Sequence, residues 1–190
     1  MEYLNKHSLR TEVKERLKSM DRMTYEHRSY LIANKLIHTE EWKNADVIGI
    51  TVSHFPEVDT WQLIRKGWEQ GKNMVIPKCI PSKKEMIFKR ITAFNQLESV
   101  FYGLFEPMDS ETKRIDKNDI DLLIVPGLAY SKEGFRIGFG GGYYDRFLKG
   151  YHGATLSLAF AVQLLDYIPV ESHDLPVRKI ITEKSVINCQ

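Results

Sequence analysis

The chain has 190 residues, of which 43% are apolar and 27% are charged, and these values are ordinary for a globular protein with one core. Its 27 basic and 25 acidic residues leave a net charge of only +2, so charge gives no indication of a nucleic-acid partner. The N-terminus has no apolar signal segment, and no apolar stretch approaches the ~20 residues that cross a bilayer, so we expect a cytoplasmic protein without a membrane partner.

Helical and strand patterns alternate along the first half of the chain. An amphipathic helix is predicted over roughly residues 4–20, because apolar residues recur there at helical spacing, namely Leu9, Val13, Leu17 and Met20. A second helix is expected from Thr24 to about Trp42, followed by a buried strand over the β-branched run Ala45–Ser53. The next helix is predicted from Val58 to Gly71.

Strand patterns dominate the second half of the chain. A short helix is expected at Tyr143–Tyr151, and strands are predicted at Asn73–Cys79, Glu85–Ile91, Ile120–Gly127, Ala154–Gln163 and Lys179–Thr182. This alternation predicts an α/β fold, with a single domain over residues 1–190 and a mainly parallel sheet covered by helices on both faces. In such folds, ligands bind at the carboxyl ends of the strands.

The segment "GFRIGFGGGYYDRFL", residues 134–148, is exceptionally rich in glycine, because four of the five residues from Gly138 to Gly142 are glycines. Bare backbone lets several N–H groups converge on an anion, and the start of a following helix adds positive charge, so a phosphate is the expected ligand. A flexible connection or a packing corner is the alternative. Neither GxGxxG nor GxxxxGK[ST] is present, since Tyr143 stands where the third glycine belongs, which disfavours Rossmann and P-loop sites.

Charged and aromatic residues flank this glycine block. Arg136 could bind a phosphate through its fork of donors, or form an ordinary salt bridge. Asp145 suits Mg²⁺ beside bound phosphates, or could interact with the dipole of the short helix as a carboxylate in its first turn. Tyr143 and Tyr144 could stack on a heterocycle, or be packing residues.

Two further regions offer weaker signals. Lys6, Arg10 and Lys14 share one face of the first helix, which could hold a polyphosphate or be a solvated face. Glu57 follows a predicted strand, where a site residue or an ordinary loop carboxylate could stand. The sequence has no HExxH, no zinc ligand set and no GxSxG, and its two cysteines form no CxxC, so we expect free thiols, with one surface disulfide as the alternative.

The segment "PGLAYSKEGFRIGFGGGYYDRFL" closely resembles the signature of the 5-formyltetrahydrofolate cyclo-ligases, also called methenyltetrahydrofolate synthetases. The resemblance covers nearly the whole chain, because four weaker segments occur in the family's order: "KHSLR", "ITVSHFPEVDT", "FYGLFEP" and "IPVESHDLPVRKIIT". It implies an enzyme that uses ATP and Mg²⁺ to convert 5-formyltetrahydrofolate into 5,10-methenyltetrahydrofolate, ADP and phosphate. It implies no nucleic-acid, membrane or obligate protein partner.

The resemblance also implies roles for individual residues. Arg136 and Tyr143 would be catalytic, and Asp145 and Asp174 would bind the magnesium ion. Folate would contact Val52, Glu57, Phe139 and Tyr143. ATP would be bound by the residues Lys6, Arg10, Arg136, Ile137, Gly138, Phe139, Gly140, Gly141, Gly142, Tyr143 and Tyr144.

One position departs from the family pattern. The family commonly has arginine between the first two glycines of the block, where this chain has Phe139. Phenylalanine cannot donate a hydrogen bond to phosphate, so other cations or the metal would have to compensate the charge. A non-catalytic folate-binding protein is therefore kept as an alternative. A different enzyme on a similar scaffold, such as a sugar-phosphate isomerase or a CoA transferase, is a second one.

Overall fold

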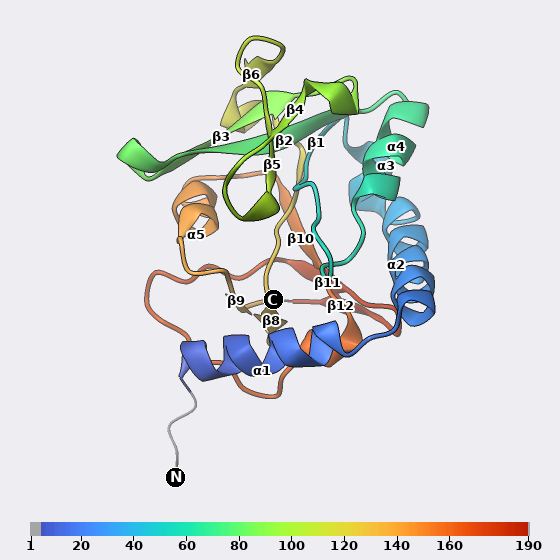
Figure 1. The fold of residues 1–190 in the computed structure, drawn as a ribbon, viewed down its shortest axis with the longest axis vertical. Helices are drawn as coiled ribbons and strands as arrows, with labels where there is room; N and C mark the ends of the chain where they lie inside the picture. The colour runs from blue at the N-terminus through green and yellow to red at the C-terminus, as the bar shows by residue number, and fades with distance from the viewer. Residues whose placement is uncertain (1–4, 190) are drawn as a thin grey trace.

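An eight-stranded sheet organises the fold, in the strand order β12-β11-β10-β7-β1-β2-β3-β6 (Figure 1). The computed structural model describes residues 5–189. Neighbouring strands from β11 to β2 are parallel, whereas β12, β3 and β6 pair antiparallel toward the edges. The strands of this sheet are β1 (Val47–Gly49), β2 (Asn73–Ile80), β3 (Glu85–Arg90), β6 (Lys113–Ile115), β7 (Leu122–Ile124), β10 (Ala154–Leu158), β11 (Lys179–Ile181) and β12 (Val186–Asn188).

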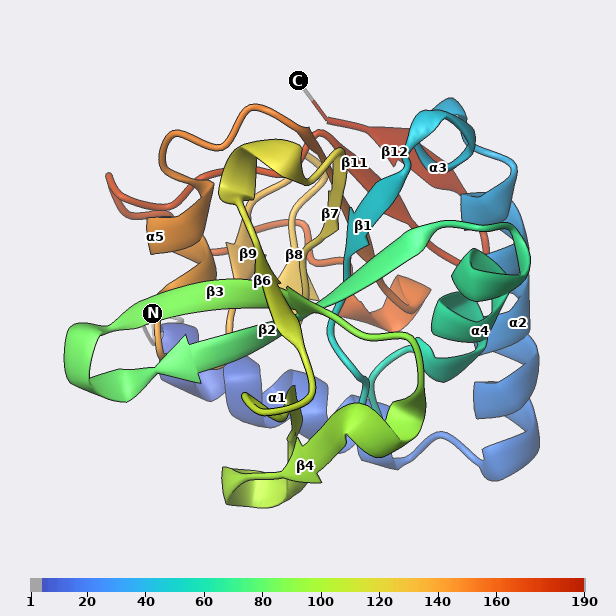
Figure 2. The ribbon, with the colours of Figure 1, turned by 90° about the horizontal axis from the view of Figure 1, so that it is seen from above.

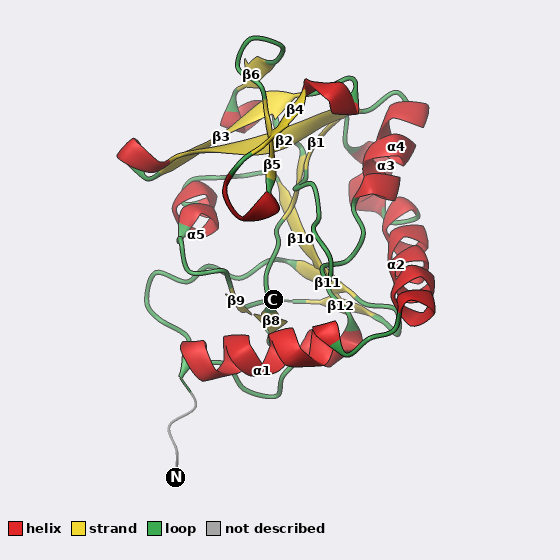
Figure 3. Cartoon of the chain, in the orientation of Figure 1, coloured by secondary structure: helices red, strands yellow, loops and turns green. Residues whose placement is uncertain are grey.

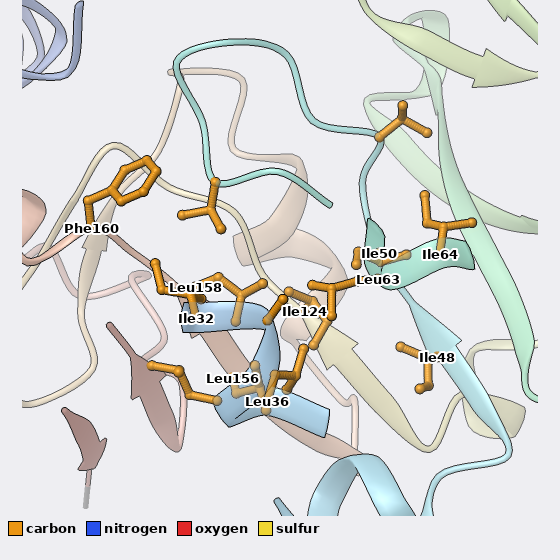
Figure 4. Close-up of a cluster of buried hydrophobic side chains, with 14 of the residues drawn as sticks. Ile32, Leu36, Ile48, Ile50, Leu63, Ile64, Ile124, Leu156, Leu158 and Phe160 are labelled. Atoms are coloured by element: carbon orange, nitrogen blue, oxygen red, sulfur yellow. The ribbon is translucent and has the colours of Figure 1, made fainter. Parts of the chain in front are cut away.

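Helices cover both faces of this sheet, as the sequence predicted (Figure 3). On β7, Leu122 and Ile124 pack into one core cluster, while Leu123 packs into the other together with Val125, the residue after the strand, which explains why this segment is apolar throughout. Figure 4 shows the first cluster, where Ile32 and other side chains meet residues of the sheet. The helices are α1 (Lys6–Lys18), α2 (Arg22–Ile37), α3 (Glu40–Asn44), α4 (Trp61–Glu69) and α5 (Tyr143–Leu148).

The shorter elements lie outside the main sheet. Two small hairpins pair β4 (Leu97–Ser99) with β5 (Phe105–Pro107), and β8 (Ala129–Tyr130) with β9 (Arg136–Ile137). Short 3₁₀ turns occur at Pro81–Lys83, Phe94–Gln96, Phe101–Gly103, Lys117–Asp119 and Ala161–Gln163. Within residues 5–189, every helix is too short or too polar to cross a membrane.

The helix predicted for residues 24–42 is in fact two helices. Asp21 caps α2 by accepting a hydrogen bond from the main-chain N–H of Thr24, so this helix begins earlier than predicted. The chain leaves the helix at His38, and Thr39 then caps α3. The strand predicted at 45–53 is also shorter, because only Val47–Gly49 pairs as β1 and the following residues turn into a loop. Leu4, inside the first predicted helix, lies outside the described residues.

Helix α1 lies across the bottom of the view in Figure 1, and the chain passes from its end to the lower end of α2. Its apolar stripe, Leu9, Val13 and Leu17, is buried in the first core cluster. The opposite residues of α1 are polar, so this helix places a row of basic side chains near the ends of the parallel strands.

Candidate functional site

A cleft of about 660 Å³ opens beyond the carboxyl ends of β1, β2 and β7, which is where a mainly parallel sheet is expected to bind ligands. Several segments form its walls: α1, the loop after β1, the tip of the β4–β5 hairpin and the glycine loop, which we define as residues 138–142. Several predicted site residues line this one cleft, namely Val52, Glu57, Arg136, Gly138, Phe139, Gly141, Gly142, Tyr143, Tyr144 and Asp145. The structure therefore brings the predicted phosphate loop and folate residues together.

The glycine loop presents unpaired main-chain donors. No N–H of residues 138–142 donates to a protein acceptor within the described part of the chain. Gly142 has φ 65°, in the left-handed region that disfavours side chains. Gly138 has no such constraint, because a Cβ there would meet no atom within 4 Å. Packing does not explain this glycine, so close approach of a ligand to its backbone is the better account.

Arg136 is held from two sides rather than free. Its Nη2 donates to Oδ1 of Asp145 at 3.0 Å, and its Nη1 donates to the carbonyl of Leu175 at 2.9 Å. Only 4% of its side chain is exposed, although it contributes to the cleft wall. Arg136 therefore links the start of α5 to the segment that precedes β11.

The basic residues of α1 divide between two places. Lys6 donates to Asp174, and Nε of Arg10 donates to the carbonyl of Gly138 at 2.8 Å, so both support the site from outside the cleft. Lys14 and Lys18 instead line the cleft itself. The sequence placed Lys14 on a helix face that could hold a polyphosphate, although the family resemblance assigned it no role. Lys18 was missed, although its spacing of four residues from Lys14 was visible.

The two predicted metal ligands lie in different surroundings. Asp145 is on the cleft wall, where a magnesium ion with one or two carboxylates could also bind substrate phosphates, so this residue fits the predicted ion. Asp174 instead groups with Glu171 and His173, with ligand atoms within 4.8 Å of one another. Burial would raise the pKa of Asp174, but the hydrogen bonds from Lys6 and from the main-chain N–H of Glu171, together with the charges of Lys6 and His173, hold that pKa below its usual value. Asp174 thus fits a structural ion pair better than a metal site.

Glu57 is turned inward by its own loop. Its Oε2 accepts a hydrogen bond from the main-chain N–H of His54 at 3.0 Å, while its own N–H donates to the carbonyl of His54. Burial raises the pKa of Glu57, although the His54 N–H opposes this rise. Val52, buried on the same loop, forms an apolar wall beside it. A half-buried carboxylate beside an apolar surface suits a flat ligand that carries hydrogen-bond donors.

Exposed aromatic side chains also surround the cleft, and one of them, Phe139, which is 53% exposed, was among the predicted site residues. Phe55, Tyr102 and Phe105 also line the cleft with exposed surface. The turn "FYGLF" was the available signal, because it holds three aromatic residues in five positions and a contiguous exposed apolar patch marks an interaction site.

The remaining predicted residues contribute through the backbone or the core. Ile137 is buried on β9, so its side chain is a core residue, and neither it nor Gly140 lines the cleft. Tyr144 packs against the second core cluster, and its hydroxyl is buried with no hydrogen-bond partner in the described chain. Burial raises the pKa of Tyr144. Tyr143 is half-buried on the cleft wall.

The known proteins to which this chain is similar share one description. Residues 3–183 match the 5-formyltetrahydrofolate cyclo-ligase family. A 5-formyltetrahydrofolate cyclo-ligase of Mus musculus is 30% identical over 95% of this chain and 94% of its own, and one of Haemophilus influenzae is 27% identical over 91% and 95%. The NMR structure of Aquifex aeolicus 5,10-methenyltetrahydrofolate synthetase superposes with a TM-score of 0.86 and 29% identity, covering 97% of this chain and 93% of that one.

Proposed function

Because the chain belongs to the 5-formyltetrahydrofolate cyclo-ligase family, we propose that it uses ATP and Mg²⁺ to convert 5-formyltetrahydrofolate into 5,10-methenyltetrahydrofolate, ADP and phosphate. One observation carries this proposal: the glycine loop with its unpaired N–H groups and the carboxylate of Glu57 line the same cleft. A nucleotide and a folate could therefore meet there. We place the reaction in the cytoplasm.

The chemistry explains why ATP is needed. A formamide carbonyl is a poor electrophile, and its oxygen is a poor leaving group. Transfer of the γ-phosphoryl group to this oxygen gives an iminium phosphate and ADP. N10 of the folate then attacks the formyl carbon and loses its proton, and the C–O bond breaks to release phosphate. The protein mainly has to position two ligands and offset phosphate charge.

The phosphate side of the site would use the glycine loop. Main-chain N–H groups of residues 138–142 would donate to phosphate oxygens, as they do at other anion sites. Arg10 and Arg136 would hold this loop and its surroundings through the contacts described above, while adding positive charge. Lys6 lies on the same helix as Arg10 and would contribute from further away. Asp145 would hold Mg²⁺, which when bound neutralises phosphate charge.

The folate side would use the loop after β1. The carboxylate of Glu57 would accept hydrogen bonds from the donor edge of the pterin, with Val52 against the flat ring. Tyr143 and Phe139 lie on the glycine-loop side of the cleft and would face the formyl-bearing ring. This arrangement would bring the formyl oxygen toward the γ-phosphoryl group.

The near-ultraviolet absorbance of the methenyl product tests the proposal directly. Purified protein would be mixed with 5-formyltetrahydrofolate and Mg²⁺, with and without ATP. An ATP-dependent rise in absorbance supports the reaction. No rise despite measured folate binding would overturn it in favour of a folate-binding protein, and no binding of either ligand would favour a different enzyme on this scaffold.

A further inference from the structure

Arg146 contacts the glycine loop, the turn at Lys84 and the ring of Tyr143. Its Nη2 donates to the carbonyl of Gly141 at 2.8 Å, and its Nε donates to the carbonyl of Lys84 at the same distance. Its guanidinium carbon lies 5.0 Å from the centre of the Tyr143 ring. Two nitrogens of the guanidinium thus donate hydrogen bonds, and its flat face lies against a ring. These contacts fix the side chain, although the residue lies at the protein surface.

These contacts fix the second half of the glycine loop. Gly142 stands between Gly141 and Tyr143, and a Cβ at this glycine would lie 2.8 Å from Nη1 of Arg146. The guanidinium therefore packs directly over the left-handed turn of the loop. The first half is held separately, because Arg10 binds the carbonyl of Gly138. With these two carbonyls turned toward arginines, the loop N–H groups stay available to a ligand.

The hydrogen bond to the carbonyl of Lys84 ties the loop to the sheet. Lys84 lies in the turn between β2 and β3, which extend together past the rest of the sheet (Figure 2). Cys79 and Met86, from the same two strands, line the cleft. Helix α5 packs beside β3 through the rings of Phe147 and Phe88. Arg146 therefore joins two walls of one cleft, the glycine loop and the β2–β3 hairpin.

We propose that Arg146 is a positioning residue that holds the glycine loop in its phosphate-binding conformation and the Tyr143 ring against the cleft. It reaches phosphate only through the loop, and this role rests on the proposed function. Lysine cannot replace it, because one ammonium has neither the fork that serves two carbonyls at once nor a flat face for the ring.

Two substitutions, Arg146→Ala and Arg146→Lys, test this role. We expect each to raise the KM for ATP about tenfold with a smaller fall in kcat. The reason is that a less ordered glycine loop weakens ATP binding more than it slows the chemical step. Guanidinium ion at millimolar concentration should restore part of the loss in the alanine variant alone. Arg22→Ala is the matched control, since Arg22 is an exposed arginine paired with Glu26 on α2, away from the cleft.

Hydrogen exchange of the ligand-free proteins gives a second readout that needs no activity. Peptides covering the start of α5, where the N–H of Arg146 donates to the carbonyl of Gly142 at 3.2 Å, should exchange faster in both Arg146 variants than in the wild type and the control. Unchanged exchange together with an unchanged KM for ATP would overturn the proposal, as would a lysine variant equal to the wild type. Wild-type protein without ATP-dependent product would overturn the proposed function instead, and exchange would still decide whether Arg146 orders the loop.

Discussion

The ammonium of Lys6 donates to Oδ2 of Asp174 at 2.7 Å and thereby fastens the start of α1 to the segment that precedes β11. The two side chains are only 19% and 9% exposed, and Glu171 lies 3.5 Å from the same ammonium. A residue predicted to bind ATP and one predicted to bind magnesium thus neutralise each other. This pair orients the helix that also carries Arg10 and Lys14.

The Lys6–Asp174 pair should behave as one unit in a double-mutant cycle. Lys6→Ala and Asp174→Asn should each lower the free energy of unfolding by about 1 kcal/mol, and the double variant by little more than either. Lys6→Ala should also raise the KM for ATP, because it leaves a negative charge uncompensated at the base of α1. Urea unfolding and ATP titrations measure both; fully additive stability losses would contradict the coupling.

This pair also predicts how stability changes with pH. Because the pKa of Asp174 is lowered in the folded protein, its contribution is fully present above the ordinary value near 3.8 and is lost as pH falls through the folded pKa. The free energy of unfolding should therefore drop less steeply below about pH 4 in Asp174→Asn than in the wild type. Parallel acid titrations would argue against the pair.

Asp145 has two roles that two substitutions can separate. Asp145→Ala should lose most turnover and also destabilise the fold by about 3 kcal/mol, because the buried guanidinium of Arg136 loses its carboxylate partner. Asp145→Asn keeps an acceptor oxygen for Arg136, so it should fold more stably yet remain nearly inactive at all Mg²⁺ concentrations. Thermal unfolding and Mg²⁺ titrations of activity measure this. Normal Mg²⁺-dependent turnover in the asparagine variant would remove Asp145 as a metal ligand.

Alanine substitution at two glycines of the same loop should affect different properties, stability at one and ATP binding at the other. Gly142→Ala should destabilise the protein by about 1 kcal/mol or more, because φ is 65° and the new Cβ would lie 2.8 Å from Arg146. Gly138→Ala meets open space, so stability should stay within ~0.5 kcal/mol while ATP binding weakens. Calorimetric unfolding and ATP titrations of both variants give the comparison. Tight ATP binding by Gly138→Ala would show that no ligand approaches there.

The sequence predicted the sheet because its central strands are uniformly apolar, and it predicted the glycine loop because clustered glycines are rare without a cause. It could not predict which cations face the cleft. Lys6 and Lys14 share one face of α1, yet only tertiary packing places Asp174 beside the first and the cleft beside the second. Tertiary packing also brings Arg146 to the carbonyl of Lys84, and the sequence could not predict this hydrogen bond.

Phe139 occupies a position where the family commonly has arginine, and it is 53% exposed on the cleft wall. Phe139→Arg should leave stability within ~0.5 kcal/mol of the wild type and raise kcat/KM for ATP, because it adds a donor beside the glycine loop. Phe101→Arg is the matched control: it adds the same charge at an 83% exposed ring outside the cleft lining. Equal gains in both variants would indicate general attraction of ATP rather than a local contact.

Substitution of Glu57 by glutamine should weaken folate binding and stabilise the folded protein. If its carboxylate accepts hydrogen bonds from the pterin, the KM for folate should rise as pH falls through the raised pKa of Glu57, above the range of an ordinary glutamate. Glu57→Gln should remove this pH dependence and raise the KM about tenfold or more. Steady-state kinetics between pH 5 and 8 on the two proteins would show it, with Glu69→Gln on the exposed end of α4 as the control.

The same substitution should stabilise the folded protein at neutral pH. A raised folded pKa means that the contribution of Glu57 to stability is present below its unfolded pKa and is lost as pH rises through the folded value. Glutamine carries no charge to desolvate and can still accept the hydrogen bond from His54, so Glu57→Gln should unfold at higher urea concentration at pH 7. A variant that lost stability and kept its folate affinity would mean that Glu57 supports the loop rather than the ligand.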